Sequence, residues 1–266
     1  MNLKQYIKKI IRYLLGKKPH SVGVFYNYSD IKKDDFWSSE FWKKQQKDSL
    51  GLIGDWCFLP ELSQTFLSVT VLKLNLLSKD KPISVLDYGG GTGYLYYEMN
   101  RVGSLLYPEN VRWVVVDEEN SLELGRQFKR DDENIEFFLE TPKSQKFDVI
   151  HISSVLQYID DVYGFLDTLL EKTNARHIIL TRISGGADTP DYFTERKVEG
   201  GSHPFHLLNL KELTKYMKSK GFQPEFRSSW SKEYIQEIDY DKVPKDHQIY
   251  CTSHMFFSTT SKNTKH

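Results

Sequence analysis

The chain has 266 residues, of which 39% are hydrophobic, 27% charged and 14% aromatic. This length suits one sizeable domain with additions, or two small domains. Lys+Arg and Asp+Glu number 36 each, so no nucleic-acid partner is expected. The cysteines, Cys57 and Cys251, are far apart and lack CxxC spacing, which argues against a disulfide framework or a metal site and favours a cytoplasmic protein.

Residues 1–18 predict a basic amphipathic helix. Leu3, Ile7 and Ile11 recur at helical spacing, while lysines and Arg12 occupy the other face. Such a helix can lie peripherally on an anionic membrane surface, or pack on its own domain or on a second copy in a homodimer. No apolar run is long enough for a transmembrane helix, and no signal-peptide cleavage site follows.

Residues 19–80 are predicted to form a helical N-terminal cap. Aromatic and charged side chains alternate irregularly over 34–47, and leucines recur at helical spacing over 59–77. Pro60 suits the first turn of the second helix, where a backbone donor is not needed.

From residue 81 to residue 258 strands alternate with helices. Strands are predicted at 83–87, 111–117, 134–139, 147–152 and 177–182, with helices at 94–102, 121–129 and 163–170. A helix at 210–220 and strands at 222–227 and 249–257 follow. The alternation indicates an α/β fold with a sheet of seven strands, mostly parallel with an antiparallel last strand, and helices on both faces.

Two segments lack periodicity. Residues 185–205 are polar and glycine-rich, which predicts a long loop of the functional or mobile kind. Residues 259–266 predict a disordered tail.

The most informative motif is D-Y-G-G-G-T-G, from Asp87 to Gly93, between a predicted strand and a helix. Glycines let the backbone turn tightly and approach a ligand closely, and the following helix adds a partly positive N-terminus. Asp87 can accept hydrogen bonds from loop amides or from an ammonium group. A dinucleotide-binding G-x-G-x-x-G requires glycine where Tyr94 or Tyr96 stands, and no G-K-[ST] of a phosphate-binding P-loop follows.

The loop resembles motif I of class I S-adenosylmethionine (SAM)-dependent methyltransferases, D-x-G-x-G-x-G. Asp87, Gly89, Gly91 and Gly93 fill its four places, and Gly90 lies between them. The alternative is a chance glycine-rich turn. The resemblance implies a Rossmann-like sheet with SAM as the cofactor.

Acidic residues follow the second predicted strand. Asp117 can take both hydroxyls of a ribose in a bidentate pair, and Glu118 replaces it if the register slips by one. Alternatively, these acids only cap the next helix, a role that Asn120 or Ser121 can also fill.

The adenine side is predicted from the same resemblance. Class I methyltransferases line the adenine with the end of the third strand and the segment after the fourth. In this chain that implies cofactor contacts from Glu140, Ser153 and Ser154.

More narrowly, residues 83–230 resemble a group of methyltransferases encoded in bacterial surface-polysaccharide and capsule gene regions. Supporting stretches are LDYGGGTG, VLQYID, TRISGGADTPDYF and HPFHLLNLKELTKYMKSKGF. This resemblance implies methyl transfer more than it implies any named sugar. We expect a small-molecule or sugar acceptor, methylated on oxygen.

A hydroxyl acceptor must lose a proton, usually to His, Asp or Glu. His203 and His206 are the preferred candidates for the base, on the predicted loop 185–205 that would close with the cap over the acceptor. Each can instead be an ordinary loop histidine. The alternative function is an inactive, methyltransferase-like SAM-binding or scaffold protein.

Overall fold

The computed structural model describes residues 21–51, 67, 70, 74, 82–102, 111–131, 133–143, 145–198, 201–230, 242–249 and 252–259. The predicted helix 1–18, most of the predicted helix 59–77 and residues 260–266 lie outside the described residues. Of the 59–77 segment, Leu67, Thr70 and Leu74 are described, and all three are helical.

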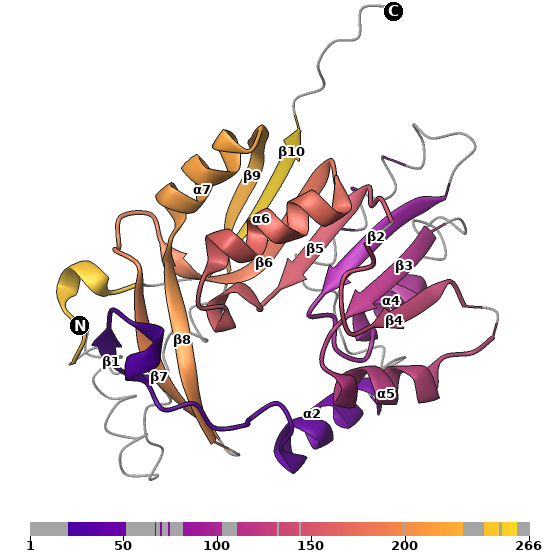
Figure 1. The fold of residues 1–266 in the computed structure, drawn as a ribbon, viewed down its shortest axis with the longest axis horizontal. Coiled ribbons are helices and arrows are strands. Elements are labelled where there is room, and N and C mark those ends of the chain that lie inside the picture. Colours follow the sequence, from indigo (N-terminus) through magenta and orange to yellow (C-terminus); the bar gives the residue numbers. More distant parts are fainter. Residues whose placement is uncertain are drawn as a thin grey trace, which may run out of the picture.

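A ten-stranded sheet forms the centre of the molecule (Figure 1). Seven of its strands follow the order β4-β3-β2-β5-β6-β10-β9. They are β2 (Ile83–Tyr88), β3 (Val111–Val116), β4 (Ile135–Phe138), β5 (Val149–Ser153), β6 (His177–Gly186), β9 (Phe222–Trp230) and β10 (Thr252–Thr259). β2 to β6 run parallel, whereas β10 runs antiparallel to both β6 and β9. This confirms the predicted α/β sheet and its antiparallel last strand.

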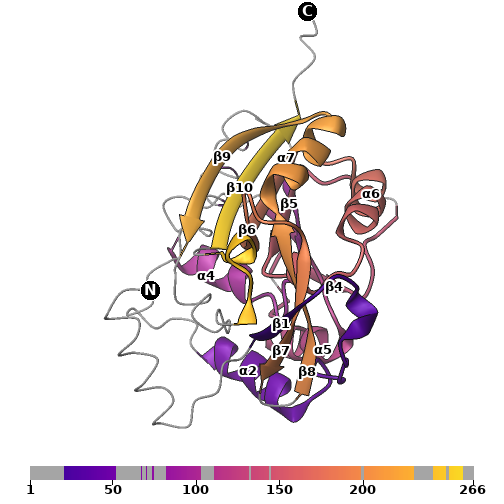
Figure 2. The same cartoon turned by 90° about the vertical axis from the view of Figure 1, so that its left-hand side faces the viewer.

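Helices cover both faces of this sheet, and Figure 2 shows α4 and α6 on opposite sides of it. The helices are α4 (Tyr94–Val102), α5 (Glu119–Phe128), α6 (Val162–Thr173) and α7 (Leu210–Ser219). Residues of α6 and α7 share one core cluster with Leu86 and Val114, whereas residues of α4 and α5 share the other with Val85, Trp113 and Val115. Neighbouring strand residues therefore enter opposite layers, which explains the nearly continuous apolar runs in these parallel strands.

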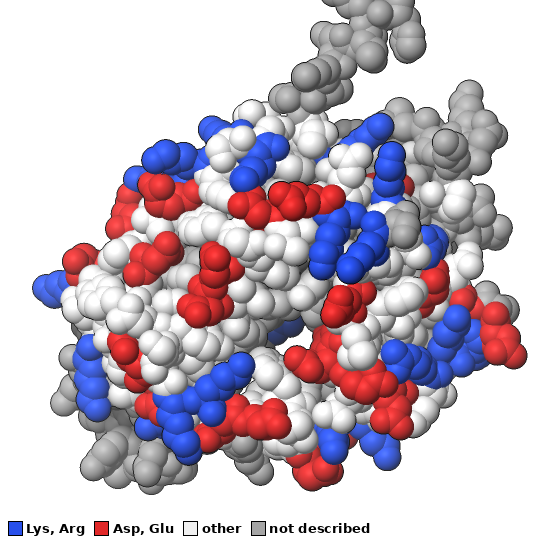
Figure 3. All heavy atoms as spheres, in the orientation of Figure 1, with Lys and Arg blue, Asp and Glu red and all other residues white. Residues whose placement is uncertain are grey.

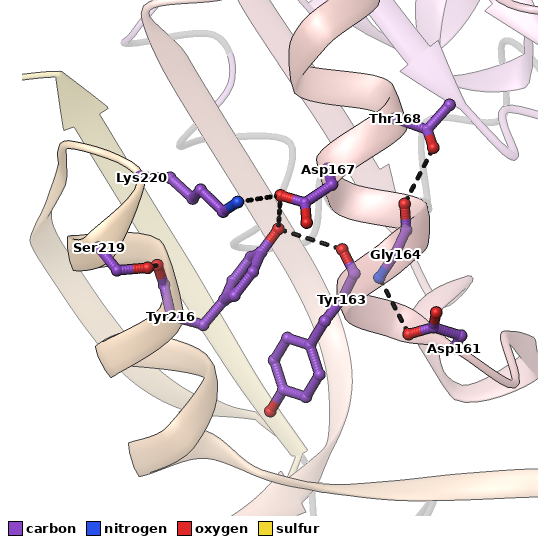
Figure 4. Close-up of polar contacts among 8 residues, drawn as sticks. All are labelled: Asp161, Tyr163, Gly164, Asp167, Thr168, Tyr216, Ser219 and Lys220. Carbon is purple, nitrogen blue, oxygen red and sulfur yellow. Dashed lines mark hydrogen bonds and ion pairs between the residues drawn. The ribbon is translucent and has the colours of Figure 1, made fainter.

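Polar contacts join α6 to α7 at the surface (Figure 4). The Tyr216 hydroxyl donates to Asp167 Oδ1 at 2.8 Å and lies 3.1 Å from the Tyr163 carbonyl oxygen. Lys220 forms an ion pair with the same carboxylate. The hydrogen bonds from Lys220 and Tyr216 lower the pKa of Asp167. These contacts hold the C-terminal end of α7, which leads into β9, against α6.

The segment 185–205 is not a loop, so that prediction was wrong. β6 continues to Gly186, and β7 (Tyr192–Val198) and β8 (Gly201–Asn209) form an antiparallel hairpin. β8 joins β6 in parallel where Gly185 and Gly186 lie opposite Leu208 and Asn209. The sequence of β8 shows no alternation of polar and apolar residues because both kinds are buried along this strand.

The N-terminal cap is also not entirely helical as predicted. β1 (Ser21–Phe25) pairs antiparallel with β7, so β1, β7 and β8 form an extension of the sheet. α2 (Glu40–Gly51) follows and packs beside α5. None of the described helices is both long and apolar enough to cross a membrane.

The contact between β6 and β8 gives a test of this extension. A Cβ on Gly185 would lie 2.1 Å from the Leu208 carbonyl oxygen, which is backbone and cannot move aside cheaply. We expect Gly185→Ala to cost about 1–3 kcal/mol of unfolding free energy, which lowers the melting temperature by a few degrees. Thermal unfolding followed by circular dichroism measures it.

Gly51→Ala is the matched control, because a Cβ at Gly51 meets nothing within 4 Å. Equal melting temperatures for the two variants would contradict the close approach of β8 to β6.

Candidate cofactor and acceptor site

The candidate site lies at the carboxyl ends of the parallel strands. β2 lies between β3 and β5, and from it the chain proceeds to β3 on one side and returns to β5 on the other. Ligands of open α/β sheets bind at such a reversal of strand order. Figure 3 shows a hollow in the surface here, between the part that carries β8 and the part that carries β3 and β4, with acidic side chains beside it.

The glycine loop after β2 has a backbone that only glycine adopts readily. Gly89, Gly91 and Gly93 have φ of 72°, 60° and 76°. A Cβ on Gly89 would lie 2.1 Å from Val155 Cγ2, and one on Gly91 would lie 2.7 Å from Gln46 Oε1. The loop is therefore enclosed by the segment after β5 on one side and by α2 on the other.

Asp87 ends β2 beneath this loop and is 2% exposed. Its Oδ1 accepts a hydrogen bond from His151 Nδ1 at 2.8 Å. Its Oδ2 is buried and has no hydrogen-bond partner among the described residues. A Cβ on Gly90 would lie 2.6 Å from this Oδ2, so the oxygen lies directly against the loop. A buried carboxylate oxygen without a partner suits a cationic ligand.

Asp117 follows β3 and connects the two strand ends. Its Oδ2 accepts from the Gly91 backbone N–H at 2.7 Å, and its Oδ1 accepts from the Glu118 N–H at 2.7 Å. Burial raises the pKa of Asp117 to about 6. Glu118 is exposed at the N-cap of α5 and makes no side-chain cap hydrogen bond. Neither acid therefore accepts a side-chain hydrogen bond from the first turn of α5, contrary to the capping alternative.

The other predicted cofactor residues lie at the same edge. Glu140 is exposed beyond β4, and Ser153 is the half-buried last residue of β5. Ser154 has φ of 57°, and its Oγ accepts from Gln157 Nε2 at 2.7 Å. Burial and then the charges of Asp117, Glu118 and Glu140 raise the pKa of Tyr88, which indicates that these acids gather around the end of β2.

His203 is buried on β8 among aromatic rings. Its ring centroid lies 5.2 Å from those of both Phe36 and Tyr158, and 5.9 Å from that of Trp37. Among the described residues, neither of its ring nitrogens has a hydrogen-bond partner. Burial, followed by the charge of Arg196, lowers its pKa to about 4. The imidazole is therefore neutral at pH 7.

His206 is three residues further along β8 and has different surroundings. Its ring centroid lies 4.2 Å from that of Phe193, and its Nδ1 donates to the Ile159 carbonyl oxygen at 3.4 Å. Its Nε2 lies 4.0 Å from Asp191 Oδ1. Burial lowers its pKa, although Asp191 opposes the shift. An odd spacing along a strand places side chains on opposite faces, so His203 and His206 do not form a pair.

Sequence reasoning missed the aromatic cluster, which consists of Phe36, Trp37, Trp42, Tyr158 and His203. Trp37 lies 4.8 Å from Trp42 and 5.0 Å from Tyr158, measured between ring centroids. Two segments connect this cluster to the glycine loop. Trp42 is one turn before Gln46 on α2, and Tyr158 follows Val155 after β5. The four-residue spacing of Trp42 and Gln46 on one helix was the only signal of this connection in the sequence. It does not reveal that Gln46 lies against Gly91, because the two are far apart in the chain.

The strand order and the glycine loop define an α/β fold that binds a nucleotide-like cofactor at the carboxyl ends of its strands. The profile of the methyltransferase domain family matches residues 64–225. The chain therefore belongs to the methyltransferase domain family and is a SAM-dependent methyltransferase. A search of curated proteins finds no match.

Solved structures support the fold. Magnesium protoporphyrin IX methyltransferase from Synechocystis PCC 6803 with bound SAM is 12% identical over 85% of this chain and 94% of its own, with a TM-score of 0.52. A chain from the complex between the Haloferax volcanii Trm112 methyltransferase activator and a methyltransferase is 11% identical over 87% of this chain and 99% of its own, with a TM-score of 0.53.

The residues at the edge fit SAM chemically. The unpartnered Asp87 Oδ2 offers an acceptor for an ammonium group, and the glycine loop leaves no side chain between the backbone and a ligand. The half-buried Asp117 offers acceptors for hydroxyls. In the described part of the chain, no group of three or more His, Cys, Asp and Glu side chains is placed to hold a metal ion.

The raised pKa of Asp117 predicts a pH dependence of SAM binding. We expect the ribose hydroxyls of SAM to hydrogen-bond the ionised Asp117, so that SAM binding lowers the pKa of this group, which is about 6 in the free protein. We expect SAM affinity to be constant well above pH 6 and to fall as the pH drops through 6. Calorimetric titration between pH 8 and pH 5 measures this.

Asp117→Asn is the control for that measurement, because an amide does not titrate. It should bind SAM more weakly at pH 8 and lose the decline below pH 6. The same decline in both proteins would assign it to another group.

Proposed function

We propose that the protein transfers the methyl group of SAM to a hydroxyl oxygen of a small-molecule or sugar acceptor, and that His203 accepts the hydroxyl proton. The observation that carries this proposal is the buried His203, whose ring nitrogens have no partner among the described residues. It belongs to an aromatic cluster that is connected to the glycine loop through α2 and through residues 155–158.

On the cofactor side, we assign one role to each strand end. Asp87 Oδ2 receives the ammonium of the methionyl group, and Asp117 receives the ribose hydroxyls, with Glu118 as the neighbouring acid. Gly89, Gly90, Gly91 and Gly93 let the backbone approach the cofactor. Glu140, Ser153 and Ser154 border the adenine. The hydrogen bond from Gly91 N–H to Asp117 supports this arrangement, because it holds the loop and the ribose acid together before a ligand arrives.

When bound, SAM supplies an electrophilic methyl group on its sulfonium. The remaining task of the protein is to hold the acceptor oxygen in line with that methyl group and to remove its proton. At neutral pH the imidazole of His203 is unprotonated and can accept a proton, although a pKa of about 4 makes it a weaker base than an ordinary histidine. His206 is the alternative base: donation from its Nδ1 to the Ile159 carbonyl oxygen leaves Nε2 as the acceptor, but this nitrogen lies near Asp191 and outside the aromatic cluster.

On the acceptor side, we propose that the β7–β8 hairpin takes the place of the predicted active-site loop 185–205. Together with residues 36–42 it forms the wall against which the acceptor lies. Trp37, Trp42 and Tyr158 of this wall are half-buried. Aromatic faces suit the apolar face of a sugar ring or a flat small molecule. The resemblance of residues 83–230 to polysaccharide-region methyltransferases makes a surface-polysaccharide precursor the first acceptor to test.

His203→Gln tests the proposal. We expect turnover to fall about 100-fold, the usual contribution of a general base, while the dissociation constant for SAM stays unchanged. The assay measures S-adenosylhomocysteine formed with a panel of free sugars, glycosides and hydroxylated small molecules.

His177→Gln is the matched control and should keep full activity, because His177 lies at the opposite, amino end of β6. A loss of turnover in His206→Gln but not in His203→Gln would transfer the role to His206. SAM binding without turnover on any acceptor would favour the SAM-binding or scaffold alternative.

A further inference from the structure

A chain of buried polar side chains crosses three central strands beneath the glycine loop. Asp87 on β2 is 2% exposed, and His151 on β5 and Thr181 on β6 are each 1% exposed. His151 Nδ1 lies 2.8 Å from Asp87 Oδ1, and His151 Nε2 lies 3.3 Å from Thr181 Oγ1. These polar groups are buried beside apolar residues of the same strands, such as Val85 and Val149, which is costly unless each has a partner.

Strand register explains why these side chains meet. Asp87 and His151 are direct partners in the parallel pairing of β2 with β5. His151 lies opposite Ile179 of β6, and Thr181 is two residues further along the same face. The contact is therefore built into the sheet and does not depend on a loop.

The hydrogen bonds determine the tautomer of His151. A carboxylate only accepts, so Nδ1 carries the proton that is donated to Asp87. In the neutral ring, Nε2 then accepts from the Thr181 hydroxyl. Burial and the nearby Arg182 and His151 lower the pKa of His254 on β10 to about 4, so His254 is neutral at neutral pH.

As a consequence, one oxygen of the Asp87 carboxylate is hydrogen-bonded and the other is available to a ligand. Oδ1 is fixed by His151, whereas Oδ2 lies against Gly90 without a partner among the described residues. A carboxylate held at only one oxygen keeps its plane, and the second oxygen keeps facing the loop. Without His151, rotation of the side chain would let Asp87 satisfy itself elsewhere.

We propose that His151 is a positioning residue for the cofactor: it holds the Asp87 carboxylate so that Oδ2 faces the glycine loop and receives the ammonium of the methionyl group. This inference rests on the proposed role of Asp87 in cofactor binding. His151 itself does not touch the cofactor and has no part in proton removal from the acceptor.

A pair of substitutions separates the two contacts of His151. An asparagine amide nitrogen occupies nearly the place of Nδ1, so His151→Asn keeps the donor to Asp87. A glutamine amide nitrogen occupies nearly the place of Nε2, so His151→Gln keeps the contact with Thr181 and loses the donor to Asp87. Both variants stay polar and neutral, and thermal unfolding of each is measured beside binding.

The ligands are S-adenosylhomocysteine and 5′-methylthioadenosine, which share the adenosine but differ in the amino-acid part. We expect His151→Gln to weaken binding of S-adenosylhomocysteine by about tenfold or more, the usual effect of losing a hydrogen bond to a charged group. Binding of 5′-methylthioadenosine, which has no ammonium group, should stay within about twofold. His151→Asn should bind both ligands nearly as the unmodified protein does.

Two results would overturn the inference. One is an equal loss for both ligands, which would mean that His151 only supports the fold. The other is weak S-adenosylhomocysteine binding in His151→Asn together with normal binding in His151→Gln. If Asp87→Asn leaves the preference for S-adenosylhomocysteine over 5′-methylthioadenosine unchanged in the otherwise unmodified protein, the proposed role of Asp87 fails instead, so the two failures are distinguishable.

Discussion

The parallel pairing of β2 with both β3 and β5 positions the groups of the cofactor edge. In this register Tyr88 lies beside Val116 and Ile152, so the chain leaves all three strands at the same edge. The Gly91 N–H then donates to Asp117, which connects the loop after β2 to the residue after β3. Because Val155 and Gln46 also contact this loop, its backbone is held from several sides before any ligand binds. Such preorganisation reduces the conformational entropy that the loop loses when a ligand binds.

Two buried polar residues with unpartnered atoms lie at the candidate site. In most proteins buried polar atoms are hydrogen-bonded. In the described part of this chain, Asp87 Oδ2 and both ring nitrogens of His203 are not. One lies under the glycine loop, and the other lies in the aromatic cluster that contacts the same segment after β5. Each therefore has capacity for a ligand group on its own side of the site.

Much of the sheet could be predicted because its residues follow simple patterns. The helix at 94–102 has the bounds that its apolar spacing indicated, and the seven central strands lie where buried runs were found. The hairpin over 192–209 could not be found in this way, because β8 buries Ser202, His203 and His206 together with its apolar residues. A polar strand that is buried on both faces has neither an alternating pattern nor an apolar run, and it reads as a loop.

The sequence by itself determined the class of the protein and indicated its candidate cofactor site. Glycines with positive φ cannot be replaced without strain, and the acid after the second strand is one residue at a fixed place, so both leave a local signature. Only the tertiary structure decided that Asp87 meets His151, that β1 and β7 extend the sheet through β8, and that His203 and His206 face opposite sides of one strand. These relations join segments far apart in the chain, and side-chain contacts across strands depend on register, which no local pattern encodes.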